Sequence, residues 1–161
     1  MILFPGELAG TRRTGIDSAH LENIMQPSAS SFTAKLGAFS PYALALLRIV
    51  VAYLFIQHGT AKLFGVPHVP SMDGVQLMSL FGASAILELV GGALLLIGLW
   101  VRPVAFVLSG EMAVAYFLVH AAQGNVLTPI LNGGEGAVLY CFIFLAMACV
   151  GGGAWTLDRR G

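Results

Sequence analysis

The fold is decided by residues 79–122, SLFGASAILELVGGALLLIGLWVRPVAFVLSGEMAVAYFLVHAA, which hold two long apolar runs joined by a turn. Each run is long enough to cross a bilayer as a helix, which takes about 20 residues. Arg102 and Pro103 mark a tight reversal between the two runs. Each run also carries one carboxylate away from its ends, at Glu88 and at Glu111. We therefore predict two consecutive transmembrane helices that each keep an acidic group inside the membrane.

The composition of the whole chain agrees with this prediction. Of 161 residues, 57% are hydrophobic and 10% are charged, whereas a soluble domain carries about 25% charged residues. The chain is therefore an integral membrane protein in contact with lipid. Its formal net charge is zero and it has no run of basic residues, so nucleic acid is not an expected partner. Cys141 and Cys149 lie on one predicted helix, about 12 Å apart, too far for a disulfide.

Four apolar runs define an all-α membrane protein with a bundle of four transmembrane helices. The transmembrane domain covers residues 41–153, and the expected spans within it are 41–64, 79–100, 103–122 and 134–152. Residues 1–40 mix Pro, Ser, Gly and both charge signs, so we expect a flexible cytoplasmic tail, with Met25 as a candidate true start. Residues 154–161 form a short basic C-terminal tail.

The distribution of basic residues orients the bundle. Six Lys and Arg residues lie in the N-terminal tail, the turn between the second and third spans, and the C-terminal tail: Arg12, Arg13, Lys35, Arg102, Arg159 and Arg160. The other two loops contain no Lys or Arg. Because cytoplasmic segments carry the excess of basic residues, both termini are predicted to be cytoplasmic.

Three charged residues lie within the spans, and their depths can be compared. At about 1.5 Å per residue, Arg48 and Glu111 lie roughly 10 and 12 Å from the cytoplasmic side and Glu88 about 18 Å. We predict one inner cluster of these three side chains, because isolated charges in a membrane are costly. Two carboxylates beside one cation rarely both ionise, so one is expected to hold a proton. This suits proton-coupled chemistry or hydrogen bonding to a quinone, and equally a structural pin between helices.

A second polar layer is predicted near the outer face. It consists of His58, Lys62, His120 and Glu135. Lys62 and Glu135 could form an ion pair, although interfacial Lys and His side chains often only reach toward water. Two histidines without a carboxylate motif do not specify a metal, so no metal site is predicted.

Four segments of the chain resemble the DoxX family. They are LLRIVVAYLFIQHGTAKLFG (46–65), ELVGGALLLIGLWVRP (88–103), GEMAVAYF (110–117) and GGGAWTLDRR (151–160). The last segment resembles the family's closing Gly-Pro-Gly-x-x-Ser-Leu-Asp, with Leu157 and Asp158 in place, Gly152 for the proline and Thr156 for the serine. The resemblance covers about residues 41 to 160. It implies a small four-helix protein of the bacterial inner membrane, in a family that includes the membrane subunit of thiosulfate:quinone oxidoreductase and partners of redox-stress enzymes.

These observations favour a multi-pass membrane subunit of an oxidoreductase complex that contacts the quinone pool. The sequence has no ligand pattern for haem, flavin or an iron–sulfur cluster, so electrons would come from a redox partner protein, with quinone as the one expected cofactor. The catalytic residues are unknown. Two alternatives are a small transporter that works as a homo-oligomer, with the buried charges gating a solute or proton, and a non-catalytic membrane anchor or assembly protein.

Overall fold

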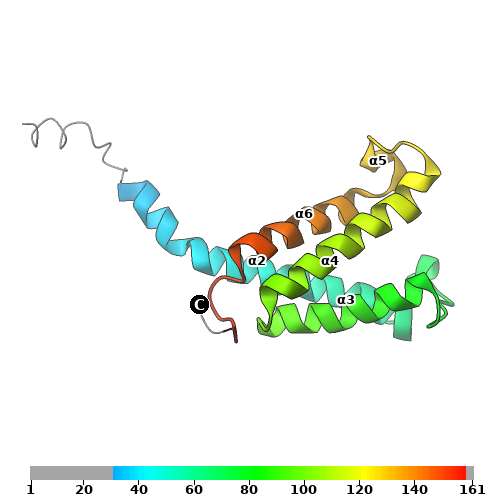
Figure 1. The fold of residues 1–161 in the computed structure, drawn as a ribbon, viewed down its shortest axis with the longest axis horizontal. Coiled ribbons are helices and arrows are strands. Elements are labelled where there is room, and N and C mark those ends of the chain that lie inside the picture. The colour runs from blue at the N-terminus through cyan, green and yellow to red at the C-terminus, as the bar shows by residue number, and fades with distance from the viewer. Residues whose placement is uncertain (1–30, 159–161) are drawn as a thin grey trace, which may run out of the picture. The chain divides into compact units, whose positions relative to one another are not determined.

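The structure is a computed structural model that describes residues 31–158, and within this range it is helical, with no strand. The four main helices are α2 (Ser31–Phe64), α3 (Leu80–Ile97), α4 (Val101–Ala115) and α6 (Glu135–Val150) (Figure 1). Short helical segments connect them: η1 (Pro70–Met72), the π-helical η2 (Tyr116–His120), η3 (Ala121–Gln123) and α5 (Pro129–Asn132).

Three helical stretches are long and apolar enough to cross a membrane. They are Thr33–Phe64, Leu80–Ile97 and Val101–Gln123, the last of which continues α4 through η2 and η3. The fourth apolar helix, Glu135–Val150, is shorter. The prediction of an all-helical membrane protein is therefore confirmed.

Helix α2 begins at Ser31, where we expected the N-terminal tail to continue to residue 40. Pro41 lies inside this helix rather than at its start. A proline usually interrupts a helix because it lacks an N–H group and crowds the preceding turn, which is why the sequence pattern suggested a boundary there. Residues 1–30, including Met25, lie outside the described residues.

The four helices share one apolar core, with residues from α2 (Ala52, Phe55), α3 (Leu95), α4 (Ala105, Leu108) and α6 (Phe144, Met147). Helices α2 and α3 cross closely at Gly59, where an added Cβ would lie 2.8 Å from the backbone nitrogen of Leu89. Small residues at helix interfaces permit this kind of backbone approach. Gly92 of α3 packs in the same way against Ile56 of α2.

The C-terminal segment folds back onto the turn between α3 and α4. Gly98 ends α3 in the left-handed conformation, with φ of 74°. Its carbonyl oxygen accepts hydrogen bonds from the backbone nitrogens of Leu157 and Asp158, at 2.9 and 3.0 Å. The Asp158 carboxylate in turn accepts from the nitrogens of Trp100 and Val101, at 2.6 and 2.8 Å. Residues 154–158, which we expected to belong to a tail, are thus part of the folded body.

Candidate functional site

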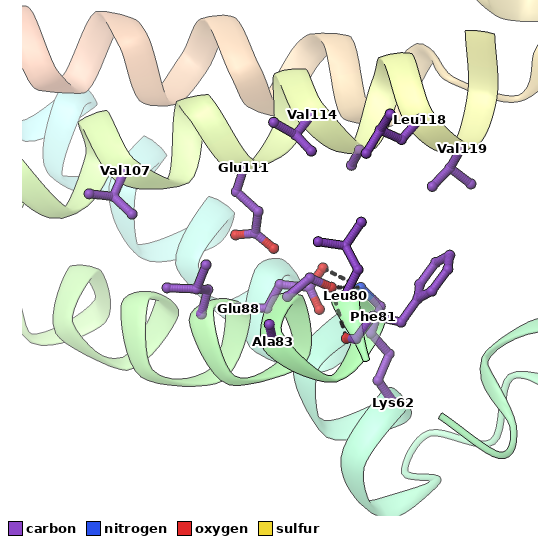
Figure 2. Close-up of a pocket in the computed structure, with 13 residues that line it drawn as sticks. Lys62, Leu80, Phe81, Ala83, Glu88, Val107, Glu111, Val114, Leu118 and Val119 are labelled. Carbon is purple, nitrogen blue, oxygen red and sulfur yellow. Dashed lines mark hydrogen bonds and ion pairs between the residues drawn. The ribbon is translucent and has the colours of Figure 1, made fainter. Parts of the chain in front are cut away.

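An apolar cavity of about 270 Å³ lies between α3 and α4, with Lys62 of α2 at its edge (Figure 2). We call it the lateral cavity. Most of its lining is aliphatic or aromatic, and three of its residues carry ionisable groups: Lys62, Glu88 and Glu111. The cavity therefore combines an apolar wall with a small number of charged groups, which is the usual composition of a small-molecule site.

Glu88 is held in the wall by an ion pair. Its carboxylate Oε1 lies 2.6 Å from Lys62 Nζ, and its side chain is 3% exposed. Lys62 Nζ also donates to Ser84 Oγ at 2.8 Å, one turn before Glu88 on the same helix. Glu88 belongs to the buried stripe of α3 that includes Ala85 and Gly92, so helix packing fixes its position. Its second oxygen, Oε2, is buried and has no hydrogen-bond partner within the described residues.

Glu111 approaches the same cavity from α4. Figure 2 shows its carboxylate directed across the cavity toward Glu88. Both oxygens of Glu111 are buried without a hydrogen-bond partner in the described part of the chain. Since most buried polar atoms in proteins are paired, these three carboxylate oxygens make the lateral cavity a candidate site within the described residues. The structure therefore brings together two of the three residues of the predicted inner cluster.

The prediction that Arg48 joins this cluster is wrong. Its guanidinium donates to backbone carbonyl oxygens instead, at Leu95 and Leu96 of α3 and at Gly152, Ala154 and Trp155 of the C-terminal segment. The last carbonyls of a helix have no partner within it and carry the negative end of the helix dipole, so a cation is favourable there. The depth of a residue along its helix does not give the direction of a long side chain.

A second cavity, of about 400 Å³, lies beside the helix ends and collects most of the predicted outer layer. His58, Lys62 and His120 all line it, and we call it the loop-side cavity. Glu135 is exposed and does not line it. The predicted pair of Lys62 with Glu135 is wrong because the Lys62 ammonium reaches toward the bundle interior and binds Glu88.

Comparison with known proteins gives the family of the chain. The family model for DoxX matches residues 43–121. An uncharacterized protein of Haemophilus influenzae is 47% identical over 124 residues, which are 76% of this chain and 92% of that protein. The chain belongs to the DoxX family. It is also similar to the inner membrane protein YphA of Escherichia coli, 29% identical over 142 residues, 77% of this chain and 94% of that protein. No solved structure matches it.

The ion pair that sequence reasoning missed in this DoxX protein is Lys62 with Glu88. A signal for it was present, because Lys62 falls within about 40° of Arg48 around the helix axis and so faces the bundle. The ammonium of a lysine also extends several ångströms from its backbone, so its depth differs from that of its Cα. In this DoxX protein the cation of the acidic cluster is thus Lys62, and Arg48 has a different role.

Proposed function

We propose that this DoxX protein is the quinone-binding membrane subunit of an oxidoreductase complex in a bacterial inner membrane. The observation that carries the proposal is the lateral cavity, where Glu88 Oε2 and both oxygens of Glu111 are buried and have no hydrogen-bond partner among residues 31–158. A quinone has an apolar ring and tail and two oxygen atoms that form hydrogen bonds. Such a molecule would lie against the apolar wall: a quinone oxygen would accept a hydrogen bond from protonated Glu111, and a quinol hydroxyl would donate to a carboxylate oxygen.

The size and surroundings of the lateral cavity support this ligand class. Small-molecule sites have volumes of about 300–1,000 Å³. The lateral cavity, at about 270 Å³, lies just below this range, so it suits the head group of a quinone rather than the whole molecule. Several of its lining residues are also exposed on the outer surface of the bundle, among them Leu80, Phe81 and Leu118. An isoprenoid tail could therefore extend from the cavity along α3 and α4 into the lipid.

The residues at the cavity would handle protons. Reduction of a quinone to a quinol consumes two electrons and two protons, and the electrons would come from a partner chain. Glu111, in its protonated form, would donate a hydrogen bond and then one proton to a ligand oxygen, and after taking up a further proton from water it would supply the second. Lys62 compensates the charge of Glu88 and fixes the orientation of its carboxylate. Glu88 Oε2 would therefore stay within hydrogen-bond distance of the ligand. Proton transfer by a positioned carboxyl group is the ordinary contribution of a protein at such a site.

The membrane arrangement we propose has four spans with both termini in the cytoplasm. In support of it, α2 near Pro41, the α3–α4 turn and the C-terminal segment meet at one end of the bundle. Pro41 O accepts from Ala154 N at 2.8 Å, and Gly98 O accepts from Leu157 N. Arg102 lies in the first turn of α4, next to this end of the bundle, as the distribution of basic residues requires of the cytoplasmic side.

Binding of a short-chain ubiquinone analogue to the full chain in nanodiscs tests the proposal. We expect Glu111→Leu to raise the Kd for the analogue about threefold to tenfold, since a hydrogen bond between neutral groups contributes about 0.5–1.5 kcal/mol. The matched control is Glu135→Leu, which changes an exposed carboxylate outside the cavity and should leave Kd within about twofold. An unchanged Kd in Glu111→Leu, or no binding to the parent protein, would refute quinone binding at this site.

Isolation in mild detergent tests the redox partner. Recovery of an oxidoreductase chain with the protein would support the proposal. The second candidate function is a transporter, which one observation favours: Lys62 and Glu88 line both cavities and could separate them as a gate. Recovery of a homo-oligomer without a redox chain, together with no quinone binding, would favour transport.

A further inference from the structure

The Lys62–Glu88 ion pair lies at the boundary between the two cavities. Five residues line both of them: Lys62, Phe81, Glu88, Ala115 and Val119. The cavities are therefore neighbours that meet at this pair. The polar contacts of Lys62, at 2.6 Å to Glu88 Oε1 and 2.8 Å to Ser84 Oγ, keep its ammonium at the common wall.

The two cavities have different surroundings. The lateral cavity is lined from α3 and α4 by side chains such as Leu87, Val107 and Val114, which are 40%, 51% and 48% exposed on the outer surface of the helices. In a membrane that apolar surface faces lipid. The loop-side cavity instead includes Ser71 and Met72 of η1 and Gly133 before α6, which belong to the connections between helices. Connections of this kind lie at the membrane surface and meet water.

The two histidines of the loop-side cavity have a defined tautomer. His58 Nδ1 lies 3.0 Å from Leu54 O, and His120 Nδ1 lies 3.1 Å from Asn132 O. A carbonyl oxygen only accepts a hydrogen bond, so each Nδ1 must carry its proton. In the neutral ring the Nε2 atom is then left with a lone pair that can accept a proton. The loop-side cavity thus has two proton-accepting groups within it.

We propose that the Lys62–Glu88 pair separates two entrances to one site, the lateral cavity admitting an apolar ligand from the lipid and the loop-side cavity admitting water, and therefore protons, from the side of the η1 and α5 connections. This inference deepens the proposed function, on which it rests for the identity of the apolar ligand. In the proposed topology the water-facing entrance is periplasmic, because the connections without Lys or Arg lie on that side.

All groups that face the pair fit this arrangement. His58 shares α2 with Lys62, and Tyr140 of α6 packs against the His58 ring at a centroid distance of 5.9 Å. Glu111 faces the pair from α4, and His120 from η2. The proton acceptors His58 and His120 are on the loop side, whereas Glu111 is on the lateral side. A proton that enters from the loop side thus meets the histidines first, then Glu88, and reaches Glu111 last.

A cysteine at Ala115 reports on both entrances without removing a charge. Ala115 lines both cavities, and the reporter is Ala115→Cys in the full chain with Cys141→Ala and Cys149→Ala. Two thiol probes are compared in oriented membrane vesicles: a membrane-impermeant sulfonated methanethiosulfonate and a lipid-soluble pyrene maleimide. We expect the sulfonated probe to react only from the periplasmic side and the pyrene probe to react with either orientation of the vesicles.

Two matched variants narrow one entrance each. Gly136 lines only the loop-side cavity, with open space at its Cβ position, and Ala83 lines only the lateral cavity. Gly136→Phe should slow the sulfonated probe at least tenfold and leave the pyrene probe within twofold, and Ala83→Phe should do the reverse. The probe that remains fast in each variant shows that the protein is folded.

Several results would overturn the two-entrance arrangement. They are no reaction with the sulfonated probe, reaction from the cytoplasmic side only, or a sulfonated-probe rate that responds to Ala83→Phe and not to Gly136→Phe. These results are independent of quinone binding. If the labelling shows no separate entrances but the Kd for the ubiquinone analogue is intact, only the two-entrance arrangement is refuted. If both entrances are found but the analogue does not bind, only the identity of the ligand is refuted.

Discussion

Replacement of Arg48 by methionine should release the C-terminal segment and destabilise the bundle. The side chain is fully buried, with 0% relative exposure. Its Nε donates to Gly152 O at 3.1 Å, and its two terminal nitrogens donate to Leu96 O and Trp155 O at 2.9 Å each. One side chain thus joins the end of α3 to the segment that closes that end of the bundle.

The expected loss in the free energy of unfolding follows from these three hydrogen bonds. A hydrogen bond that involves a charged group contributes about 1.5–3 kcal/mol, so three of them at the lower end give ~4–5 kcal/mol. Losses above ~4 kcal/mol are exceptional for a single substitution and are expected only where a buried network is broken. Arg48→Lys keeps the charge but lacks the planar fork of donors, so it should recover only part of this loss.

The assay is reversible unfolding by denaturing detergent in mild-detergent micelles, combined with cleavage by chymotrypsin after Trp155. Arg48→Met should lower the free energy of unfolding by ~4 kcal/mol and expose the segment to cleavage at least ~10-fold faster. Arg102→Met is the control, since Arg102 is exposed at the start of α4 and its loss should cost under ~0.5 kcal/mol. An Arg48→Met protein within ~1 kcal/mol of the parent, with a protected segment, would refute a structural role built on these bonds.

Three further predictions use the same unfolding assay. Lys62→Met leaves the buried Glu88 carboxylate without its partner and should cost ~3 kcal/mol, whereas Lys62→Met with Glu88→Gln should recover most of that loss; equal losses in the single and double variants would contradict the ion pair. Gly59→Ala should cost ~1–3 kcal/mol because the new Cβ would lie 2.8 Å from a backbone atom of α3. Gly110→Ala, where nothing lies within 4 Å, should instead be neutral or stabilise by up to ~1 kcal/mol, and similar effects at both glycines would speak against the close crossing. Asp158→Asn weakens two charge-assisted bonds at the start of α4 and should cost ~1 kcal/mol, so a loss under ~0.3 kcal/mol would refute this capping.

The helices were predicted well from the sequence because each of them is marked by a long run of apolar residues. Apolar runs of about 20 residues specify membrane-spanning helices almost by length alone. The reversal between the second and third spans was predicted a few residues too late: it lies at Gly98 to Trp100, and Arg102 and Pro103 belong to the first turn of α4. The start of α2 was not predicted correctly, because Pro41 does not end the helix: residues 31–40 continue it on the N-terminal side of the proline.

The candidate site was predicted in part. The glutamates were placed together because depth along two adjacent spans is fixed by a rise of about 1.5 Å per residue. The cation was assigned wrongly, since Arg48 and Lys62 both face the bundle and both have long side chains. Their partners depend on where the C-terminal segment folds, and a stretch rich in glycine carries no periodic signal that would reveal its return to Gly98.

The buried polar atoms of this bundle fall into two groups, those with hydrogen-bond partners and those without. At one end, the Arg48 guanidinium has an acceptor for each of its nitrogens and Asp158 has a donor for each of its oxygens. A fully satisfied network of this kind stabilises one conformation and has nothing left to offer a ligand. At the lateral cavity, Glu88 Oε2 and both oxygens of Glu111 are buried without a partner in the described residues. A structural pin would gain stability from pairing them, so their unpaired state supports the proposal that these carboxyl groups serve a ligand or a proton rather than the fold.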